Sequence, residues 1–83
     1  MDKVLICLYV PLLEQTYDIY IPINKKVSFI KKLIISTLME LTDNLFIANK
    51  DIKLSNKNTS RVYEDNEFII DTDIRNGTKL VLL

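Results

Sequence analysis

The passage from residue 74 to residue 83 constrains the fold of this chain more than any other. It reads Ile-Arg-Asn-Gly-Thr-Lys-Leu-Val-Leu-Leu, a tight turn followed by an apolar run. Such a run is typical of a buried strand, because its leucines must be covered from water. The sequence stops inside this run, at Leu83, without a terminal Gly-Gly. We therefore expect a chain that is not activated or conjugated through a flexible tail.

Size and composition predict one soluble domain, residues 1–83, with one core. Hydrophobic residues make up 48% and charged residues 27% of the chain, as in globular domains. The 11 basic and 11 acidic side chains cancel, so net charge does not favour nucleic acid or an anionic membrane. The single Cys7 cannot form an internal disulfide. Asp2 and Pro11 argue against a signal peptide, and no apolar run approaches the roughly 20 residues of a membrane helix. We expect a cytoplasmic protein.

The first half of the chain predicts a hairpin followed by a helix. Residues 3–10 are apolar on both alternations, and residues 16–22 alternate cleanly after a polar turn at Glu14 and Gln15. The period then becomes helical over residues 27–41. Ser28 is the expected N-cap and Asp43–Asn44 the expected stop. The predicted core-facing stripe of this helix is Val27, Ile30, Ile34, Leu38 and Leu41.

The second half predicts short strands around an irregular connection. We expect a strand over residues 51–55 with Ile52 and Leu54 inward, and a brief edge strand over residues 61–63. Residues 64–73 form an acidic connection with one short helical turn. Leu80 and Leu82 point inward from the last strand. The two most apolar strands are the first and the last, so we expect them to pair at the sheet centre. The predicted fold is α+β, a β-grasp with a mixed sheet of four to five strands on one α-helix.

The opening hairpin, the single helix and the closing passage over residues 71–80 together resemble a ubiquitin-like domain. In such domains an apolar residue fills the core just before a tight turn; here Ile74 takes that place and Gly77 the turn. The stretch over residues 16–22 and the Leu-Leu ending are similar to the YukD/EsaB family, ubiquitin-like proteins of Gram-positive type VII (ESAT-6-type) secretion systems. The resemblance implies a cytosolic accessory component, not conjugated to targets, that binds cytosolic parts of the secretion membrane components.

The residue types argue against catalysis, metals and cofactors. Without histidine, the usual activated nucleophiles and transition-metal sites cannot be built. Cys7 lies among apolar residues and is interpreted as a packing residue. One glycine is too few for a phosphate-cradling loop. The acidic residues of the connection lack the spacing of a calcium loop and are interpreted as solvated surface; they are Glu64, Asp65, Glu67, Asp71 and Asp73.

Alternation places a set of apolar side chains on the outer face of the sheet, away from the helix. This holds if the inward set is Val4, Ile6, Leu8, Tyr17, Ile19, Leu80 and Leu82. An exposed apolar patch usually marks a contact surface, for a partner protein or for a homodimer. The predicted partner-binding residues are Leu5, Cys7, Tyr9, Tyr20, Val81 and Leu83. The second candidate is the apolar helix flank of Ile35 and Met39.

Four lysines form the basic cluster of the sequence: Lys25, Lys26, Lys31 and Lys32. At about 1 kcal/mol each, they support at most peripheral contact with a membrane surface. Binding of single-stranded nucleic acid favours aromatic side chains interleaved with basic ones, and the sequence does not interleave them here, so no nucleic acid is expected. An alternative function stays open, a soluble regulator of gene expression acting through RNA or a transcription partner.

Overall fold

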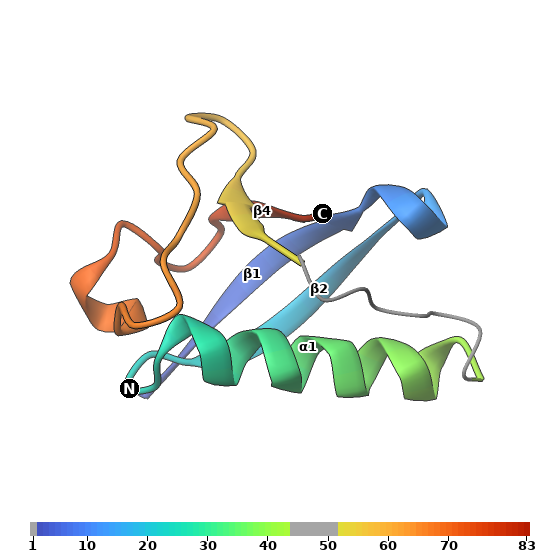
Figure 1. Ribbon diagram of the computed structural model, residues 1–83, viewed down its shortest axis with the longest axis horizontal. Coiled ribbons are helices and arrows are strands. Elements are labelled where there is room, and N and C mark those ends of the chain that lie inside the picture. The colour runs from blue at the N-terminus through green and yellow to red at the C-terminus, as the bar shows by residue number, and fades with distance from the viewer. Residues whose placement is uncertain (1, 44–51) are drawn as a thin grey trace.

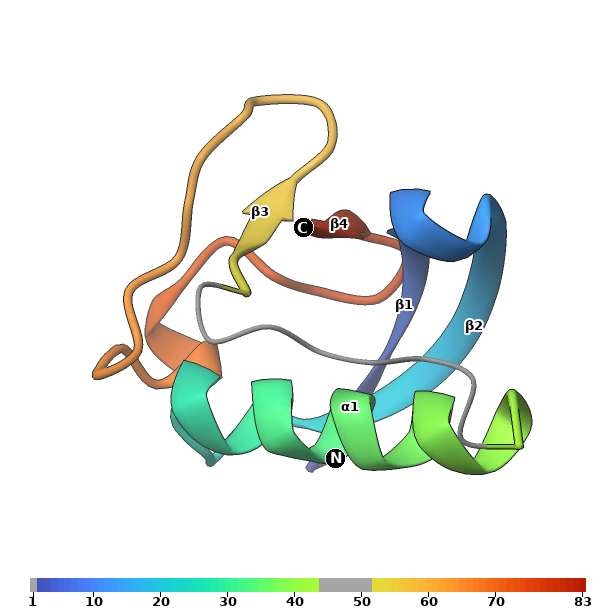
Figure 2. The same ribbon diagram turned by 45° about the vertical axis from the view of Figure 1, so that its right-hand side comes forward.

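The structure is a computed structural model that describes residues 2–43 and 52–83. A four-stranded sheet has the order β2-β1-β4-β3. The strands are β1 (Lys3–Val10), β2 (Gln15–Pro22), β3 (Leu54–Asn56) and β4 (Lys79–Leu82), and the helix is α1 (Val27–Leu41). Figures 1 and 2 show α1 lying along one side of the sheet. The predicted α+β β-grasp is confirmed, with four strands.

The strands from the two ends of the chain pair at the sheet centre, as predicted. β1 and β2 form an antiparallel hairpin in which Ile6 is opposite Ile19. Between them lies the 3-10 helix η1 (Pro11–Leu13), and Glu14 turns the chain with φ of 51°. β1 and β4 are parallel, with Leu8 opposite Leu80. β3 pairs antiparallel with β4 on the far side.

The turn before β4 is attached to β1, and this contact fixes where the last strand begins. Gly77 has φ of 85°, a conformation that favours glycine. Its N–H donates to the Leu5 carbonyl at 2.8 Å, and the Leu5 N–H donates to Asn76 Oδ1 at 2.8 Å. The Cys7 N–H then donates to the Thr78 carbonyl at 3.0 Å. These bonds set the register of β4 against β1 and thereby the outer face described below.

The core lies between α1 and the sheet and confirms most of the predicted set. Ile30, Ile34 and Leu38 are fully buried. Tyr17 and Ile19 are half-buried and pack against the edge of the core, because β2 is an edge strand. The predicted inward residues of β1 and β4, and the apolar residue before the last turn, are buried: Val4, Ile6, Leu8, Leu80, Leu82 and Ile74.

Two predictions at the ends of the helix are wrong, the burial of Leu41 and the N-cap role of Ser28. Leu41 was expected in the core but is 62% exposed, because it is the last helical residue and no described element covers it. Ser28 is not the N-cap. The helix begins at Val27, and the N–H groups of Val27 and Ser28 donate to the carbonyls of Glu67 and Asp65 at 2.8 and 3.1 Å. A distant loop therefore supplies the acceptors that a capping side chain would provide. Asp43, with φ of 53°, does follow the helix end. The predicted stop residue Asn44 and strand start Asp51 lie outside the described residues.

The second half of the chain departs from prediction at residues 61–63. The strand β3 begins at Leu54, which is buried, while Ile52 is half-buried. No edge strand forms at residues 61–63, where the structure has one isolated bridge, between Val62 and Ser55. The segment stays bonded to β3, since the Asn56 N–H donates to the Arg61 carbonyl at 2.8 Å and the Tyr63 N–H donates to the Leu54 carbonyl at 3.0 Å, but the pairing is too short to form a strand. Tyr63 points into the core and is 2% exposed. The acidic connection carries the expected short turn, the 3-10 helix η2 (Ile69–Asp71).

Candidate interaction surfaces

The outer sheet face, the side of the sheet away from α1, carries all six predicted partner-binding residues. Leu5 is opposite Tyr20 across β1 and β2, and Tyr9 is opposite Val81 across β1 and β4. Opposed residues in neighbouring strands share a face, so these side chains are neighbours. The backbone N–H and carbonyl of Leu83 both bond to Lys53 at 2.9 Å, which continues the same alternation.

The exposure of these side chains fits a contact surface that lies at the centre of the outer sheet face. Leu5, Cys7, Tyr9 and Val81 are half-buried by their neighbours. At the margins, Tyr20 is 59% and Leu83 64% exposed. Figures 1 and 2 show no described α-helix against this side of the sheet. That these residues bind a partner stays a prediction.

Sequence reasoning missed two features of the outer sheet face. Val62 is 49% exposed and bridges to Ser55, which is itself opposite Val81, so it extends the apolar surface beyond β3. Lysines also occupy outward positions: Lys79 is opposite Cys7, and the Lys57 ammonium lies 5.7 Å from the centre of the Tyr9 ring. The alternation rule that selected Tyr9 and Val81 could have found these lysines as well.

The helix flank offers a smaller apolar area. Ile35 is half-buried and packs against the core, whereas Met39 is 39% exposed. The two lie in a shallow groove along α1 whose other lining residues are Lys32, Ser36 and Glu40. Polar side chains therefore surround two apolar ones, and this flank is the weaker candidate for a docking site.

The basic cluster does not present four available charges. Lys31 Nζ lies 2.6 Å from Asp65 Oδ1 in an ion pair. The ammonium of Lys25 lies 5.2 Å from the Phe29 ring centre, and that of Lys26 lies 5.6 Å from the Phe68 ring centre. Phe29 lies between the two lysine pairs in the sequence, and folding also brings Phe68 beside Lys26, which corrects the argument from interleaving. Within residues 2–43 and 52–83, no helix is long and apolar enough to cross a lipid bilayer.

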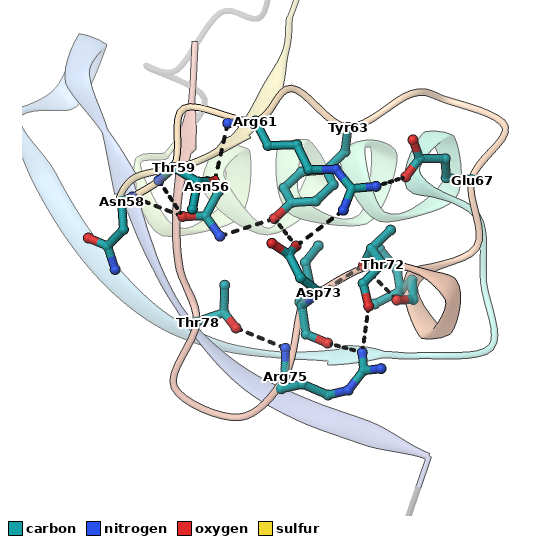
Figure 3. A network of polar contacts seen from close by, with 12 residues as sticks. Asn56, Asn58, Thr59, Arg61, Tyr63, Glu67, Thr72, Asp73, Arg75 and Thr78 are labelled. Carbon is teal, nitrogen blue, oxygen red and sulfur yellow. Dashed lines mark hydrogen bonds and ion pairs between the residues drawn. The ribbon is translucent and has the colours of Figure 1, made fainter.

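Three of the acidic side chains of the connection make intramolecular contacts, and Figure 3 shows those of Glu67 and Asp73. Asp65 pairs with Lys31, and Glu67 lies 2.9 Å from the Arg61 guanidinium, which also approaches Asp73 at 3.7 Å. In the part of the chain that the structure describes, no group of three or more acidic, cysteine or histidine residues could hold a metal ion. The acidic stretch holds the loop to the rest of the domain.

Tyr63 is the centre of this polar network and was not singled out from the sequence. Its hydroxyl donates to Asp73 Oδ1 at 2.5 Å and accepts from Asn56 Nδ2 at 3.2 Å. Burial, together with the hydrogen bond to Asp73, raises the pKa of Tyr63 to about 12. The Arg61 guanidinium stacks on the ring with its carbon 5.0 Å from the centre. A tyrosine that resists ionisation and bridges sheet and loop is a structural element, and it supplies no base for chemistry.

Comparison with known proteins supports the fold and leaves the family open. No protein-family model matches the chain, and no curated protein matches it. Solved structures do match. The N-terminal ubiquitin-like domain of the 4931431F19Rik protein has a TM-score of 0.75 at 17% identity, over 99% of this chain and 74% of that one. The ubiquitin-like domain of Arabidopsis thaliana At2g32350 has a TM-score of 0.72 at 14% identity, over 100% and 78%.

A third similar structure belongs to an inner membrane complex. A chain of the MycP5-free ESX-5 inner membrane complex matches with a TM-score of 0.75 at 16% identity, over all of this chain but 21% of that one. At such identities the likeness defines the fold alone. This protein is a ubiquitin-like β-grasp domain.

Proposed function

We propose that this protein is a non-catalytic ubiquitin-like adaptor of a type VII secretion system. It acts by non-covalent contact between its outer sheet face and cytosolic parts of the membrane components. The observation that carries the proposal is the apolar centre of that face, formed by Leu5, Cys7, Tyr9 and Val81, which no described helix covers. A surface of this kind usually marks a protein contact, and tyrosine is a favoured anchor residue in such contacts.

Two further observations support the secretion setting. The residues over 16–22 resemble the second strand of the YukD/EsaB family. A chain of the ESX-5 inner membrane complex also contains a domain of this fold within a longer protein. A fold found within a chain of an inner membrane complex fits a module for docking between components of one machine.

The test uses purified cytosolic regions of the membrane components and two charge substitutions on the outer sheet face. Tyr9→Asp and Val81→Asp should leave the fold intact, at a cost of about 1 kcal/mol each from lost strand preference. Both should abolish binding, because an unpaired carboxylate buried in an interface costs several kcal/mol. Circular dichroism checks the fold, and calorimetry measures the binding. Ile70→Asp, at a side chain 50% exposed on η2, is the matched control.

Normal binding by both folded variants would remove the outer sheet face from the proposal. The helix flank would then be tested with Met39→Asp, which is cleaner than Ile35→Asp because Ile35 packs against the core. Light scattering on the unmodified protein and on the variants shows whether the same face instead joins two copies of the chain.

One observation favours the alternative of an RNA-linked regulator. Lys25 and Lys26 lie over the rings of Phe29 and Phe68, which are 45% and 41% exposed. Exposed rings beside lysines are a stacking platform for single-stranded nucleic acid. Fluorescence anisotropy with a short single-stranded RNA separates the two functions: the regulator requires binding that Phe29→Ala abolishes, and the adaptor requires none.

A further inference from the structure

The outward positions of the sheet carry an uneven set of charges around their apolar centre. Besides Lys79, which is opposite Cys7, Lys3 is opposite Pro22 at the start of β1. Lys53 bonds to Leu83 through its backbone, and the Lys57 N–H donates to the Lys79 carbonyl at 2.9 Å. By strand alternation both point outward beside Ser55, which shares this face with Val81. The acid among these outward strand positions is Asp18, also opposite Cys7.

Four lysines against one aspartate leave this face with an excess of three positive charges, although the whole chain is neutral. All four ammonium groups belong to exposed residues. Among the described residues, none of these lysines is within ion-pair distance of a carboxylate, in contrast to Lys31. Within residues 2–43 and 52–83, no side-chain carboxylate therefore pairs with the lysines of the outer sheet face.

The charge is also asymmetric across the sheet. Lys53, Lys57 and Lys79 are all on the β3–β4 half. The β2 half presents Tyr20 and Asp18, and none of the β2 residues that share this face is basic. A complementary surface must therefore place carboxylates over β3 and β4 and apolar groups over β1 and Tyr20. Charge complementarity of this kind sets the orientation of a complex and its rate of association.

We propose that the outer sheet face selects an acidic–apolar protein segment, in which glutamate or aspartate side chains flank a hydrophobic centre. This inference rests on the proposed function, since it names the chemistry of the partner that this face binds. A second copy of the chain fits less well, because in a two-fold contact of the same face each copy contributes four lysines and one aspartate, so both surfaces are positively charged. An anionic membrane fits less well too, because Leu5, Cys7, Tyr9 and Val81 are half-buried in the sheet and do not project as anchors.

The test uses two short synthetic peptides of identical length, one with glutamates around leucine and tyrosine residues and one with lysines in place of the glutamates. Binding to isotope-labelled protein is followed by the backbone amide resonances. The acidic peptide should shift the resonances of Leu5, Tyr9 and Val81 and bind at least about tenfold more tightly than the basic one. Raising the salt from about 50 mM to about 500 mM should weaken it several-fold.

The charge-reversed pair Lys53→Glu with Lys79→Glu should remove or invert this preference without unfolding the protein, because both side chains are exposed and make no ion pair. Lys25→Glu with Lys32→Glu makes the same change in net charge away from the sheet and should leave the preference intact. Equal binding of both peptides, binding of neither, or shifts confined to other residues would overturn the inference.

Two further experiments separate the remaining outcomes, one with lipid vesicles and one with the secretion components. The protein is sedimented with vesicles that contain equal amounts of phosphatidylglycerol and phosphatidylcholine. If it sediments with them and the Lys53→Glu/Lys79→Glu protein does not, the lysines bind lipid, and this result would also overturn the inference. Failure of the peptide test while Tyr9→Asp still abolishes binding to the secretion components rejects the acidic partner alone. A clear peptide preference without any binding to those components rejects the secretion setting alone.

Discussion

Replacing Ile34 with alanine tests the central packing of helix on sheet. Ile34 is fully buried in the middle of α1, on the stripe with Ile30 and Leu38. The substitution removes the side-chain carbons beyond Cβ, worth about 2.5 kcal/mol at roughly 0.8 kcal/mol per buried methylene. The cavity left behind adds to this, and the better helix propensity of alanine offsets up to about 0.5 kcal/mol. We expect a loss of about 3 kcal/mol in the free energy of unfolding.

That loss is a large part of the total stability, which is about 5–15 kcal/mol for natural domains. For a domain of this length each kcal/mol lowers the melting temperature by about 4–8 °C, so Ile34→Ala should lower it by about 12–24 °C. Urea unfolding followed by circular dichroism measures the free energy, and a thermal scan measures the midpoint.

The chain offers a matched control in the next residue. Ile35→Ala makes the same chemical change in the same helix, but Ile35 is only half-buried. It should cost about 1 kcal/mol, since less apolar surface leaves water in the folded state. If the two variants lost equal stability, or if Ile34→Ala left the melting temperature unmoved, the helix register described above would be refuted.

Two further predictions concern the polar network and the turn before β4. Because the pKa of Tyr63 is raised from 10.0 in the unfolded chain to about 12 in the folded one, the stability from this group is fully present below pH 10 and is lost as the pH rises towards 12. Urea unfolding at several pH values over this range should show that loss of stability, and its absence would refute the role of the network. The Tyr63→Phe protein should lack the part of the loss that comes from Tyr63. Gly77→Ala should lower the free energy of unfolding by about 1 kcal/mol. The loss comes from backbone strain at φ of 85° alone, because an added Cβ would meet no atom within 4 Å, and an unchanged midpoint of urea unfolding would contradict this prediction.

Elements with strong periodicity could be predicted from sequence, because one physical rule determined them. Alternation assigned the inward side of β1 and β4, and helical spacing assigned Ile30, Ile34 and Leu38 to the core. The role of Ile74 followed from its place before the turn at Gly77. Pairing of β1 with β4 also followed, because the two most apolar strands gain most from central positions.

Features that depend on distant partners could not be predicted in this way. The helix start at Val27 was predicted correctly, but the N-cap was wrongly assigned to Ser28, because the carbonyls of Glu67 and Asp65, far along the chain, receive the first N–H groups of α1. Residues 61–63 were predicted as a strand, but the structure has a single bridge there, between Val62 and Ser55, and the buried Tyr63 bonds through its hydroxyl to Asp73. A local pattern contains no information on either contact.

The candidate site was predicted in part for the same reason. The apolar residues of the outer sheet face follow from alternation, and the structure brings them together. Among the lysines around them, Lys79 lies on β4 while Lys53 and Lys57 flank β3, and their arrangement depends on the order of these strands in the sheet. The contact of Lys26 with Phe68 likewise requires the fold, since the two residues are far apart in the sequence.

The most direct test of the central claim is secretion by cells in which the gene carries a single substitution on the outer sheet face. Cells producing the Val81→Asp protein should fail to export the substrates of the type VII system while accumulating the folded protein at normal levels. Cells with Ile70→Asp should export them as the parent strain does. Normal export with Val81→Asp, at normal protein levels, would contradict the assignment of this face as the working surface of the adaptor.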